Sequence, residues 1–469
     1  MRVIVVGAGA GGAVMAGRAA EAGHDVTLVE AGPHAPGPLA LRRGDATEAL
    51  AVTDWFWSSS RFATSGGAVG DYRLGRGVGG GTAVNTLALT AGDSADYARW
   101  GDRPGMAMWG STTVAAALAR VRATLAPVPV APGPFSSAFT ELAERSGFGR
   151  GGASTGLDSI GVVPISAPVD GRGARRTAAD AYLTPAVEVR AGAPVDRIVL
   201  SRGRARGVDL LDGTRLDADA VVVAAGAVHS PRLLARSGAG LAMPRPVADH
   251  PSASITVGLR PGGQSRVDPV VPPIATVLRW RSDAEPGVEP ASGQPPEGGA
   301  DLMALVMDHV GPGRAGRRYG AVIVMLTDPR STGRLSSASF DPGWLRHGDD
   351  RRRLAAGIAR MAGLLADPEL GDVIDGAYLD DQGTTIASVC DRGPTALEQW
   401  VAATPGPVTH ATSTLALGHA LSPDGSVPGW PGLSVADAST LPTIPNANPQ
   451  LPIMAVAETL AEVRCAEWG

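Results

Sequence analysis

The chain has 469 residues, which is enough for about three average domains or for one large two-part enzyme with a sizeable core. Its 63 glycines and 38 prolines exceed average usage but stay below the level of a disordered chain, and all 41 basic residues are arginine, because no lysine occurs. The missing lysine excludes Schiff-base catalysis, pyridoxal phosphate attachment and the usual P-loop, and a formal net charge of -5 without a basic block argues against nucleic-acid binding.

The first thirty residues predict a βαβ unit. Arg2 to Val6 has the apolar pattern of a buried strand, an amphipathic helix follows to about Ala22, and Val26 to Glu30 forms a second strand. A strand, a helix and a further strand of this length are typical of a parallel α/β sheet.

A glycine motif lies between this first strand and the helix. Gly7, Gly9 and Gly12 form the pattern G-x-G-x-x-G, which lets the backbone turn sharply and approach a pyrophosphate at a helix N-terminus. Glu30 follows at the end of the second strand, where a carboxylate can accept hydrogen bonds from a ribose diol. The pattern predicts a dinucleotide site without a 2′-phosphate, and the alternative is a structural glycine turn.

A second glycine cluster, Gly79-Gly80-Gly81, lies within the segment from Arg76 to Asn85. Three adjacent glycines expose backbone N–H groups that can bind an anion or contact a flat ring. Taken alone, the cluster could also be an ordinary loop.

The middle of the chain changes character twice. Between Ala181 and Ala227 short strands alternate with turns, including Arg197 to Leu200 and Ala220 to Ala224, and a helix is expected from His229 to about Ser237. From about Ile255 to Thr404, separated strands such as Ala321 to Leu326 and a long helix near Arg351 to Leu365 predict a distinct α+β domain. The proline- and glycine-rich stretch Pro286 to Gly299 predicts a loop or a disordered insertion.

The last sixty residues contain three polar motifs: Thr409 to Thr414, Leu433 to Ser439, and Asn446 to Gln450. Asn is a favoured N-cap and Pro a favoured first helical residue, so Asn448-Pro449 predicts the start of the final helix, although Pro452 allows a slightly later start. This helix is expected to run to about Ala466, with its positive end facing whatever binds near Asn448.

Taken in order along nearly the whole chain, these motifs resemble the glucose-methanol-choline (GMC) family of flavoprotein oxidoreductases. The residues that carry the resemblance are Gly7 to Gly12 with Glu30, Trp55, Gly75 to Thr82 with Asn85, Tyr182 to Pro185 before Val195, Ala225 to Ala227 with Ser230-Pro231, Asp249-His250-Pro251, Pro329 with Gly333, His410 to Thr414, Asp437 to Ser439, and Asn448-Pro449. Two positions depart from the family pattern, because Ser413 stands where glycine is usual and Gly81 where serine is common.

The resemblance implies a two-part fold of α/β plus α+β class. A Rossmann-like FAD domain of the p-hydroxybenzoate-hydroxylase type would be assembled from residues 1–130, 175–254 and 405–469. Residues 131–174 and 255–404 would form a substrate domain on an antiparallel sheet backed by helices.

The resemblance also implies which residues contact FAD. Glu30 would hold the adenosine ribose, Gly79 to Asn85 would lie along the flavin, Val195 would meet the adenine through its backbone, and Asp437 would lie near the ribityl-pyrophosphate. The full set of expected cofactor-binding residues is Gly7, Gly9, Gly11, Gly12, Glu30, Arg76, Gly79, Gly80, Gly81, Thr82, Asn85, Val195, Ala225, Gly226, Asp437, Ala438, Pro449 and Gln450. Neither histidine nor cysteine occurs between Gly79 and Asn85, so FAD is expected to bind without a covalent bond, and no metal is expected.

The family's catalytic pair matches His410 and Asn448. His410 would act as general base on an alcohol while hydride leaves the alcohol carbon for the flavin, and Asn448 would orient the hydroxyl. His250 also lies in a family motif, where it is expected to brace the fold, and His419 matches no catalytic position. Trp55 and Trp57 are expected to pack rather than to stack on a substrate.

Three functions remain open. The first is FAD-dependent oxidation of a small alcohol, with oxygen or a respiratory carrier as electron acceptor. The second is oxidation of reduced mycofactocin, with a respiratory acceptor taking the electrons. It is suggested because the short chain and the compact stretch from Gly32 to Trp55 resemble a small bacterial branch of the family that is associated with mycofactocin. The third is a lyase of hydroxynitriles that uses the same histidine.

The compartment is inferred from weaker signals. Two cysteines cannot form a disulfide framework, which favours a reducing cytosol. The N-terminus has no visible signal peptide and no apolar run reaches the length of a membrane span, so the protein is expected in the cytoplasm, either free or peripheral to the inner face of the membrane.

Overall fold

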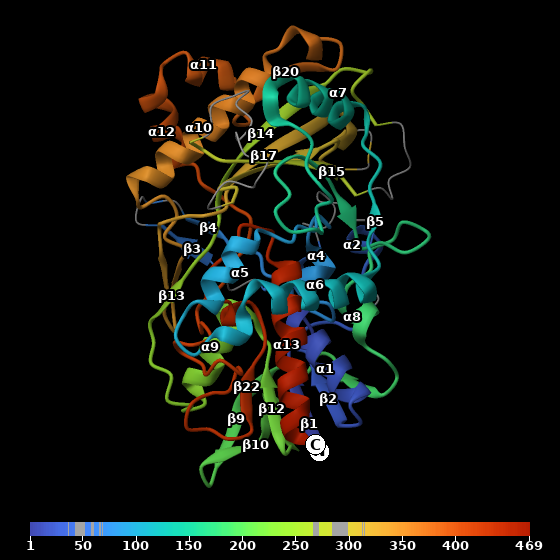
Figure 1. Cartoon of the computed structure of the whole chain (residues 1–469), viewed down its shortest axis with the longest axis vertical. Helices are drawn as coiled ribbons and strands as arrows, with labels where there is room; N and C mark the ends of the chain where they lie inside the picture. Colours follow the sequence, from blue (N-terminus) through green and yellow to red (C-terminus); the bar gives the residue numbers. More distant parts are fainter. Residues whose placement is uncertain are drawn as a thin grey trace.

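The computed structural model describes residues 1–35, 37–42, 52–57, 61–64, 67, 69–265, 272–283, 299–311, 313 and 315–469. The predicted loop or insertion Pro286 to Gly299 therefore lies outside the described residues, except for Gly299 itself. Two sheets occupy opposite ends of the molecule, the parallel sheet beside α13 and the antiparallel sheet beside α10 and α12 (Figure 1).

A five-stranded parallel sheet forms the first end. Its order is β22 (Leu433–Val435), β12 (Ala220–Val223), β1 (Arg2–Val6), β2 (Asp25–Val29) and β8 (Val187–Arg190). The central strand β1 is a run of β-branched residues buried along almost its whole length, as expected for a parallel strand with both faces covered. The predicted first strand is confirmed at both its ends.

Helices cover this sheet in successive layers. Helix α1 (Ala10–Glu21) contacts the strands, α8 (Ala178–Tyr182) and α13 (Gln450–Trp468) pack on α1, α6 (Ser111–Leu125) packs on α13, and α5 (Ser94–Gly101) packs on α6. Glycines and alanines fill the buried face of α1, which allows the helix to approach its neighbours closely. A meander of β9 (Val195–Ser201), β10 (Arg204–Leu210) and β11 (Arg215–Asp217) packs against β12, next to α9 (Gly226–Arg236). Helix α9 begins at Gly226, three residues before the predicted start.

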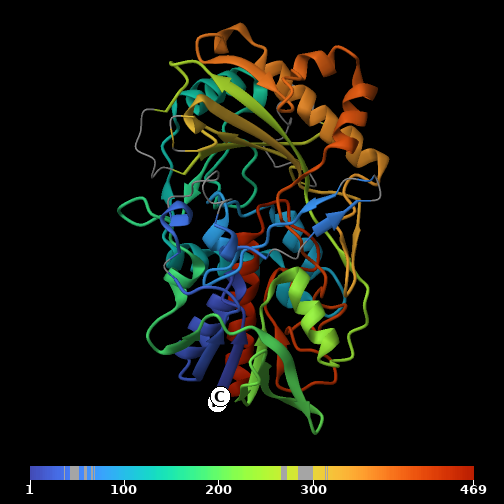
Figure 2. The ribbon, with the colours of Figure 1, turned by 180° about the vertical axis from the view of Figure 1, so that it is seen from behind.

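A seven-stranded antiparallel sheet forms the second end (Figure 2). Its order is β20 (Ile374–Tyr378), β14 (Pro251–Leu259), β17 (Tyr319–Leu326), β16 (Leu302–Met307), β15 (Ile274–Trp280) and β6 (Gly161–Pro164), and β21 (Gly406–Pro407) pairs with β14. Alternate residues of β17 face two different apolar clusters: Val322 and Val324 pack with the helices, whereas Ala321 and Met325 pack on the other face. The helices of this half are α7 (Pro134–Ala143), α10 (Gly348–Leu365), α11 (Ile386–Cys390) and α12 (Pro394–Ala403).

Short elements join the two ends. They are α2 (Leu39–Arg42), β3 (Arg61–Ala63), β4 (Val69–Asp71), α4 (Gly81–Val84), β5 (Val128–Pro129), β7 (Ser166–Ala167), β13 (Arg245–Val247), β18 (Gly333–Leu335) and β19 (Phe340–Asp341). The predicted combination of a parallel α/β sheet with an antiparallel sheet backed by helices is confirmed. Within the described residues, no helix is both long enough and apolar enough to cross a bilayer.

Candidate active site

A cavity of about 250 Å³ opens at the carboxyl ends of the parallel strands and reaches the loop from Thr409 to Ala411. The last residues of β1 and β2, Val6 and Val29, line it, and so does Ala224 directly after β12. The crevice outside the carboxyl ends of the strands is where open α/β sheets bind ligands.

The first glycine turn is fixed by close backbone contacts. Gly7 has φ +105°, and a Cβ on it would lie 2.4 Å from the carbonyl oxygen of Ala224. A Cβ on Gly12 would lie 1.9 Å from the Gly7 carbonyl oxygen, and one on Gly11 would lie 2.1 Å from that of Ala436. Side chains at these positions would push α1 away from the sheet.

The two glycine clusters pack directly on each other. The Gly79 N–H donates to the Ala8 carbonyl at 2.9 Å, and a Cβ on Gly80 would meet the Cα of Gly9 at 2.6 Å. Gly81 differs, because no atom lies within 4 Å of its added Cβ and the residue lines the cavity. The second cluster is thus part of the same wall as the dinucleotide-type turn.

A buried arginine supports the second glycine segment from behind. Arg175 donates to the carbonyl oxygens of Leu41, Thr82 and Asn85 and to Asn85 Oδ1. No carboxylate among the described residues forms an ion pair with it, and burial lowers its pKa to about 9. Asn85 Nδ2 in turn donates to Gln450 Oε1 at 2.6 Å, which ties this segment to the start of α13.

Glu30 is buried at the end of β2 and accepts three backbone N–H groups. Its Oε1 accepts from Gly32 at 2.8 Å and Gly77 at 3.0 Å, and its Oε2 accepts from Ala8 at 2.9 Å. Burial raises the pKa of Glu30, and these hydrogen bonds together with Arg76 oppose the rise. Because Oε2 has only one partner and Glu30 lines the cavity, one lone pair stays available to a ligand hydroxyl.

Trp57 and His229 lie face to face in the cavity wall, which the sequence did not predict. Their ring centroids are 4.4 Å apart with an interplanar angle of 33°, and the Arg76 guanidinium lies 5.4 Å from the Trp57 centroid. Burial and the nearby Arg232 and Arg236 lower the pKa of His229 to about 4. Trp55, by contrast, is buried in a small apolar cluster, as expected.

Each oxygen of the Asp437 carboxylate accepts two hydrogen bonds from the protein. Its Oδ2 accepts from Gly226 N at 2.8 Å and from Ser230 Oγ at 2.5 Å, and its Oδ1 accepts from Ser439 N at 2.8 Å and Ser439 Oγ at 2.5 Å. Burial raises its pKa. Asp437 therefore caps the start of α9 and pins it to the end of β22, beside the cavity.

Val195 lies in the wall beyond Glu30. Its carbonyl accepts from Arg236 Nη2 at 2.9 Å, and the same side chain reaches the Asp196 carbonyl through Nε at 2.5 Å. Arg236 thus fixes this part of the wall to α9.

His410 marks the opposite end of the cavity, where a buried aspartate organises the loop. Asp249 Oδ1 accepts from the backbone N–H groups of His410 and His250, each at 2.9 Å, and its Oδ2 accepts from Tyr72 OH at 2.8 Å. The Tyr72 oxygen accepts from Ala411 N at 2.9 Å. Burial raises the pKa of Asp249 to about 7.

The two imidazoles at this end are in direct contact. His410 Nδ1 lies 3.0 Å from His250 Nδ1, and His250 Nε2 lies 3.1 Å from the Thr327 carbonyl oxygen. Burial and the neighbouring His250 lower the pKa of His410 well below its ordinary value, and burial lowers that of His250 to about 3. Both rings are therefore neutral at pH 7.

Asn448 is buried but does not cap α13. The helix begins at Gln450 with Pro449 at the cap position, so the later start that Pro452 allowed is the observed one. The Asn448 Nδ2 donates to the Ala88 carbonyl at 3.0 Å and its N–H donates to Thr90 Oγ1 at 2.7 Å, while Oδ1 has no hydrogen-bond partner among the described residues. The amide is thus held by a loop far away in sequence instead of by the helix.

The predicted residues fall into two groups, according to whether they line the cavity. Those that line it are Gly7, Gly9, Gly11, Glu30, Gly80, Gly81, Val195, Ala225, Gly226, His410, Asp437, Ala438 and Pro449. The other predicted residues, which are not among those that line it, are Gly12, Arg76, Gly79, Thr82, Asn85, Asn448 and Gln450. His410 lines the same cavity as the glycine turn, although about 400 residues separate them in the chain.

Comparison with known families and proteins agrees with this arrangement. Models of the GMC oxidoreductase family match residues 1–252 and 329–457. The chain is 28% identical to a 5-(hydroxymethyl)furfural oxidase of Methylovorus sp. (strain MP688), over 98% of this chain and 97% of that protein. It is 30% identical to an uncharacterized GMC-type oxidoreductase of Mycobacterium tuberculosis, over 99% and 76%, and 26% identical to an oxygen-dependent choline dehydrogenase of Paraburkholderia xenovorans (strain LB400), over 98% and 93%.

Solved structures share the fold. A pyridoxine 4-oxidase from Mesorbium loti superposes with a TM-score of 0.82 at 22% identity, covering 98% of both chains. A formate oxidase from Aspergillus oryzae RIB40 superposes with a TM-score of 0.82 at 19% identity, covering 99% of this chain and 98% of that one.

Proposed function

Because the chain belongs to the GMC oxidoreductase family of FAD-dependent enzymes, we propose that it oxidises a small alcohol to a carbonyl compound with His410 as the general base. The observation that carries the proposal is the position of a neutral, partly buried imidazole in the wall of the cavity that also contains the dinucleotide-type glycine turn. The 5-(hydroxymethyl)furfural oxidase and the choline dehydrogenase among the relatives support an alcohol as the substrate class.

The residues of the cavity fit FAD. Helix α1 begins at the glycine turn, so the N–H groups of its first turn have no partner within the helix and can bind a pyrophosphate. A Cβ on Gly81 would meet no atom within 4 Å, and one on Gly9 would make only an ordinary 3.9 Å contact with the Cα of Gly80, which leaves room beside both backbones. Glu30 Oε2 can accept a ribose hydroxyl. When bound, FAD would supply the acceptor for the hydride that leaves the alcohol carbon.

His410 would take the hydroxyl proton. Its Nδ1 contacts His250, so Nε2 is the ring nitrogen left to face a substrate. The lowered pKa keeps this nitrogen unprotonated at neutral pH, as a general base requires. Asn448 Nδ2 uses one N–H on Ala88, and its second N–H would donate to the substrate oxygen and orient it.

The proposed division of the chain follows the two sheets. All strands of the parallel sheet lie within residues 1–130, 175–254 and 405–469, which we assign to FAD binding. Most strands of the antiparallel sheet lie within 131–174 and 255–404, assigned to substrate, whereas β14 starts at Pro251 and β21 lies at 406–407. We infer that FAD binds without a covalent bond, because the wall segment 79–85 contains neither histidine nor cysteine.

The test is anaerobic flavin absorbance of the purified protein, titrated with primary and secondary alcohols and with reduced mycofactocin. The expected result is bleaching by an alcohol, and rapid recovery in air would identify an oxidase, whereas recovery only with an artificial acceptor would identify a dehydrogenase. Bleaching by reduced mycofactocin alone would identify the mycofactocin-linked branch. Cleavage of a hydroxynitrile with an unchanged flavin spectrum would replace the proposal by the lyase.

A further inference from the structure

We propose that His250 is a positioning residue that fixes the tautomer of His410, so that Nε2 of His410 is the bare nitrogen that meets the substrate. This inference rests on the proposed function. It uses a residue that the sequence assigns only to bracing the fold, and it follows from two contacts of the His250 ring.

The first contact determines which ring nitrogen of His250 carries the proton. Its Nε2 lies 3.1 Å from the Thr327 carbonyl oxygen, which can only accept, so Nε2 carries the hydrogen. His250 is completely buried and burial keeps it neutral, so its Nδ1 must be unprotonated. The 3.1 Å bond to the Thr327 carbonyl thus selects the tautomer of His250 with its hydrogen on Nε2.

The second contact determines which ring nitrogen of His410 carries the hydrogen. His250 Nδ1 lies 3.0 Å from His410 Nδ1, and because the first is an acceptor, the second must be the donor. His410 then carries its hydrogen on Nδ1 and its lone pair on Nε2. In the other tautomer of His410, two lone pairs would face each other across 3.0 Å in a buried site.

The surroundings hold both rings in place. One oxygen of Asp249 accepts the backbone N–H groups of His250 and His410, and Tyr72 donates to the other oxygen. Asp249 and Tyr72 are the titratable groups in contact with the pair, and neither bonds to a ring nitrogen. Besides the contact with His410 and the 3.1 Å bond from Nε2 to the Thr327 carbonyl, the carbonyl of Pro445 also lies near the His250 ring.

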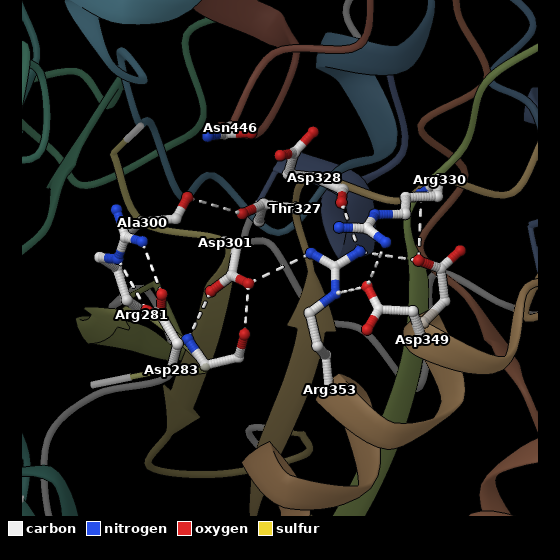
Figure 3. Close-up of polar contacts among 12 residues, drawn as sticks. Arg281, Asp283, Ala300, Asp301, Thr327, Asp328, Arg330, Asp349, Arg353 and Asn446 are labelled. Carbon is white, nitrogen blue, oxygen red and sulfur yellow. Dashed lines mark hydrogen bonds and ion pairs between the residues drawn. The ribbon is translucent and has the colours of Figure 1, made fainter. Parts of the chain in front are cut away.

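The Thr327 carbonyl is itself anchored. Thr327 N donates to the Asp301 carbonyl at 2.8 Å and its Oγ1 donates to the Ala300 carbonyl at 3.3 Å. Next to it, the Asp328 carbonyl accepts from Arg353 at 3.0 Å, and Arg353 also pairs with the Asp301 carboxylate at 3.1 Å (Figure 3). A network on α10 and β16 therefore fixes the acceptor on which the tautomer depends.

The direct test is nuclear magnetic resonance of the FAD-loaded protein with ¹⁵N-labelled histidine. We expect His410 to show a protonated Nδ1 and an unprotonated Nε2, and His250 to show the reverse; loss of the His410 signals in His410→Gln assigns them. In His250→Leu we expect Nε2 of His410 to gain hydrogen. An unprotonated Nδ1 on His410 in the unmodified protein would overturn the proposal.

The kinetic test compares three variants in anaerobic flavin reduction by an alcohol. His250→Leu removes the acceptor and should slow reduction by about 10- to 100-fold, the factor expected for one buried hydrogen bond, at unchanged KM. His250→Asn keeps an amide oxygen that can accept from His410 Nδ1 and should recover most of the rate. His419→Leu is the matched control, because it makes the same substitution at an exposed histidine, and it should reduce flavin like the unmodified protein.

Two outcomes distinguish a failure of the positioning role from a failure of the proposed function. If His250→Leu is folded, binds FAD and reduces flavin at the original rate, the positioning role is wrong while the proposed function stands. If no alcohol reduces the flavin of the unmodified protein, the proposed function is wrong, and the resonance experiment, which needs no substrate, still decides the tautomer. Should His250→Leu fail to fold, the spectrum of the unmodified protein and the rate of His250→Asn carry the test.

Discussion

Two ends of one cavity are built on a buried carboxylate, and they use it differently. Glu30 accepts three backbone N–H groups, two of them from the glycine motifs, and one lone pair still faces the cavity. Asp249 accepts two backbone N–H groups and a tyrosine hydroxyl, lies behind the wall, and holds His250 and His410. We call the part of the cavity around Glu30 the glycine end and the part around His410 the histidine end. The comparison indicates that Glu30 can bind a ligand directly at the glycine end, whereas Asp249 acts at the histidine end through the two histidines that it positions.

The largest expected effect separates chemistry from binding at these two ends. His410→Gln should lower the rate of anaerobic flavin reduction by about 10²- to 10⁴-fold, because it removes the general base. FAD content should stay normal, since the glycine end is untouched. His419→Gln is the matched control: this exposed histidine lies nine residues further on, and its variant should react like the unmodified protein. Equal losses in both variants would remove the special role of His410.

The next effect tests how tightly the glycine end is packed. Gly12→Ala should lower the free energy of unfolding by at least about 1–3 kcal/mol and weaken FAD binding, because the new Cβ would overlap the Gly7 carbonyl. Gly363→Ala, also within a helix but with open space around its Cβ, should instead raise stability by up to about 1 kcal/mol. Urea unfolding and FAD titration measure both, and similar changes in the two variants would contradict the close packing.

The difference between the two ends also explains what the sequence could predict. The strand β1, the helix α1 and the position of Glu30 follow from local periodicity and fixed spacing, so they were predictable within a residue or two. The sequence assigns His250 only to bracing the fold, whereas its contact with His410, 160 residues away, arises only when the tertiary fold brings the two rings together.

The same reason accounts for the wrong start of α9 and for the cap that Asn448 does not form. Helix α9 begins at Gly226 because Asp437, 211 residues away, accepts the Gly226 N–H. Asn448 fails to cap α13 because its amide donates to the Ala88 carbonyl, 360 residues away. A local capping preference loses to a buried hydrogen bond that the sequence does not reveal.

A smaller effect should distinguish the carboxylate that faces the cavity. Glu30→Gln should weaken FAD binding by about 10- to 100-fold, because an amide is a weaker acceptor and one of its atoms is a donor opposite backbone N–H groups. The exposed Glu188 on the adjacent strand β8 provides the control, and Glu188→Gln should leave the FAD dissociation constant unchanged. Flavin fluorescence on release and rebinding gives both values. If the two variants bind FAD equally well, Glu30 does not contact the cofactor.

The smallest effect is expected from pH. An ordinary histidine base would lose half its activity near pH 6.5 as it gains a proton, but burial and His250 lower the pKa of His410 well below that value. The neutral base therefore persists as the pH falls, and protonation of His410 should not lower the rate of flavin reduction between pH 8 and 6. Asp249 has a pKa of about 7, so a small inflection near pH 7 belongs to it and should vanish in Asp249→Asn. A fall centred at pH 6.5 that survives in Asp249→Asn would mean that His410 titrates like an exposed imidazole, and the histidine end would then lack the buried, neutral pair on which its chemistry depends.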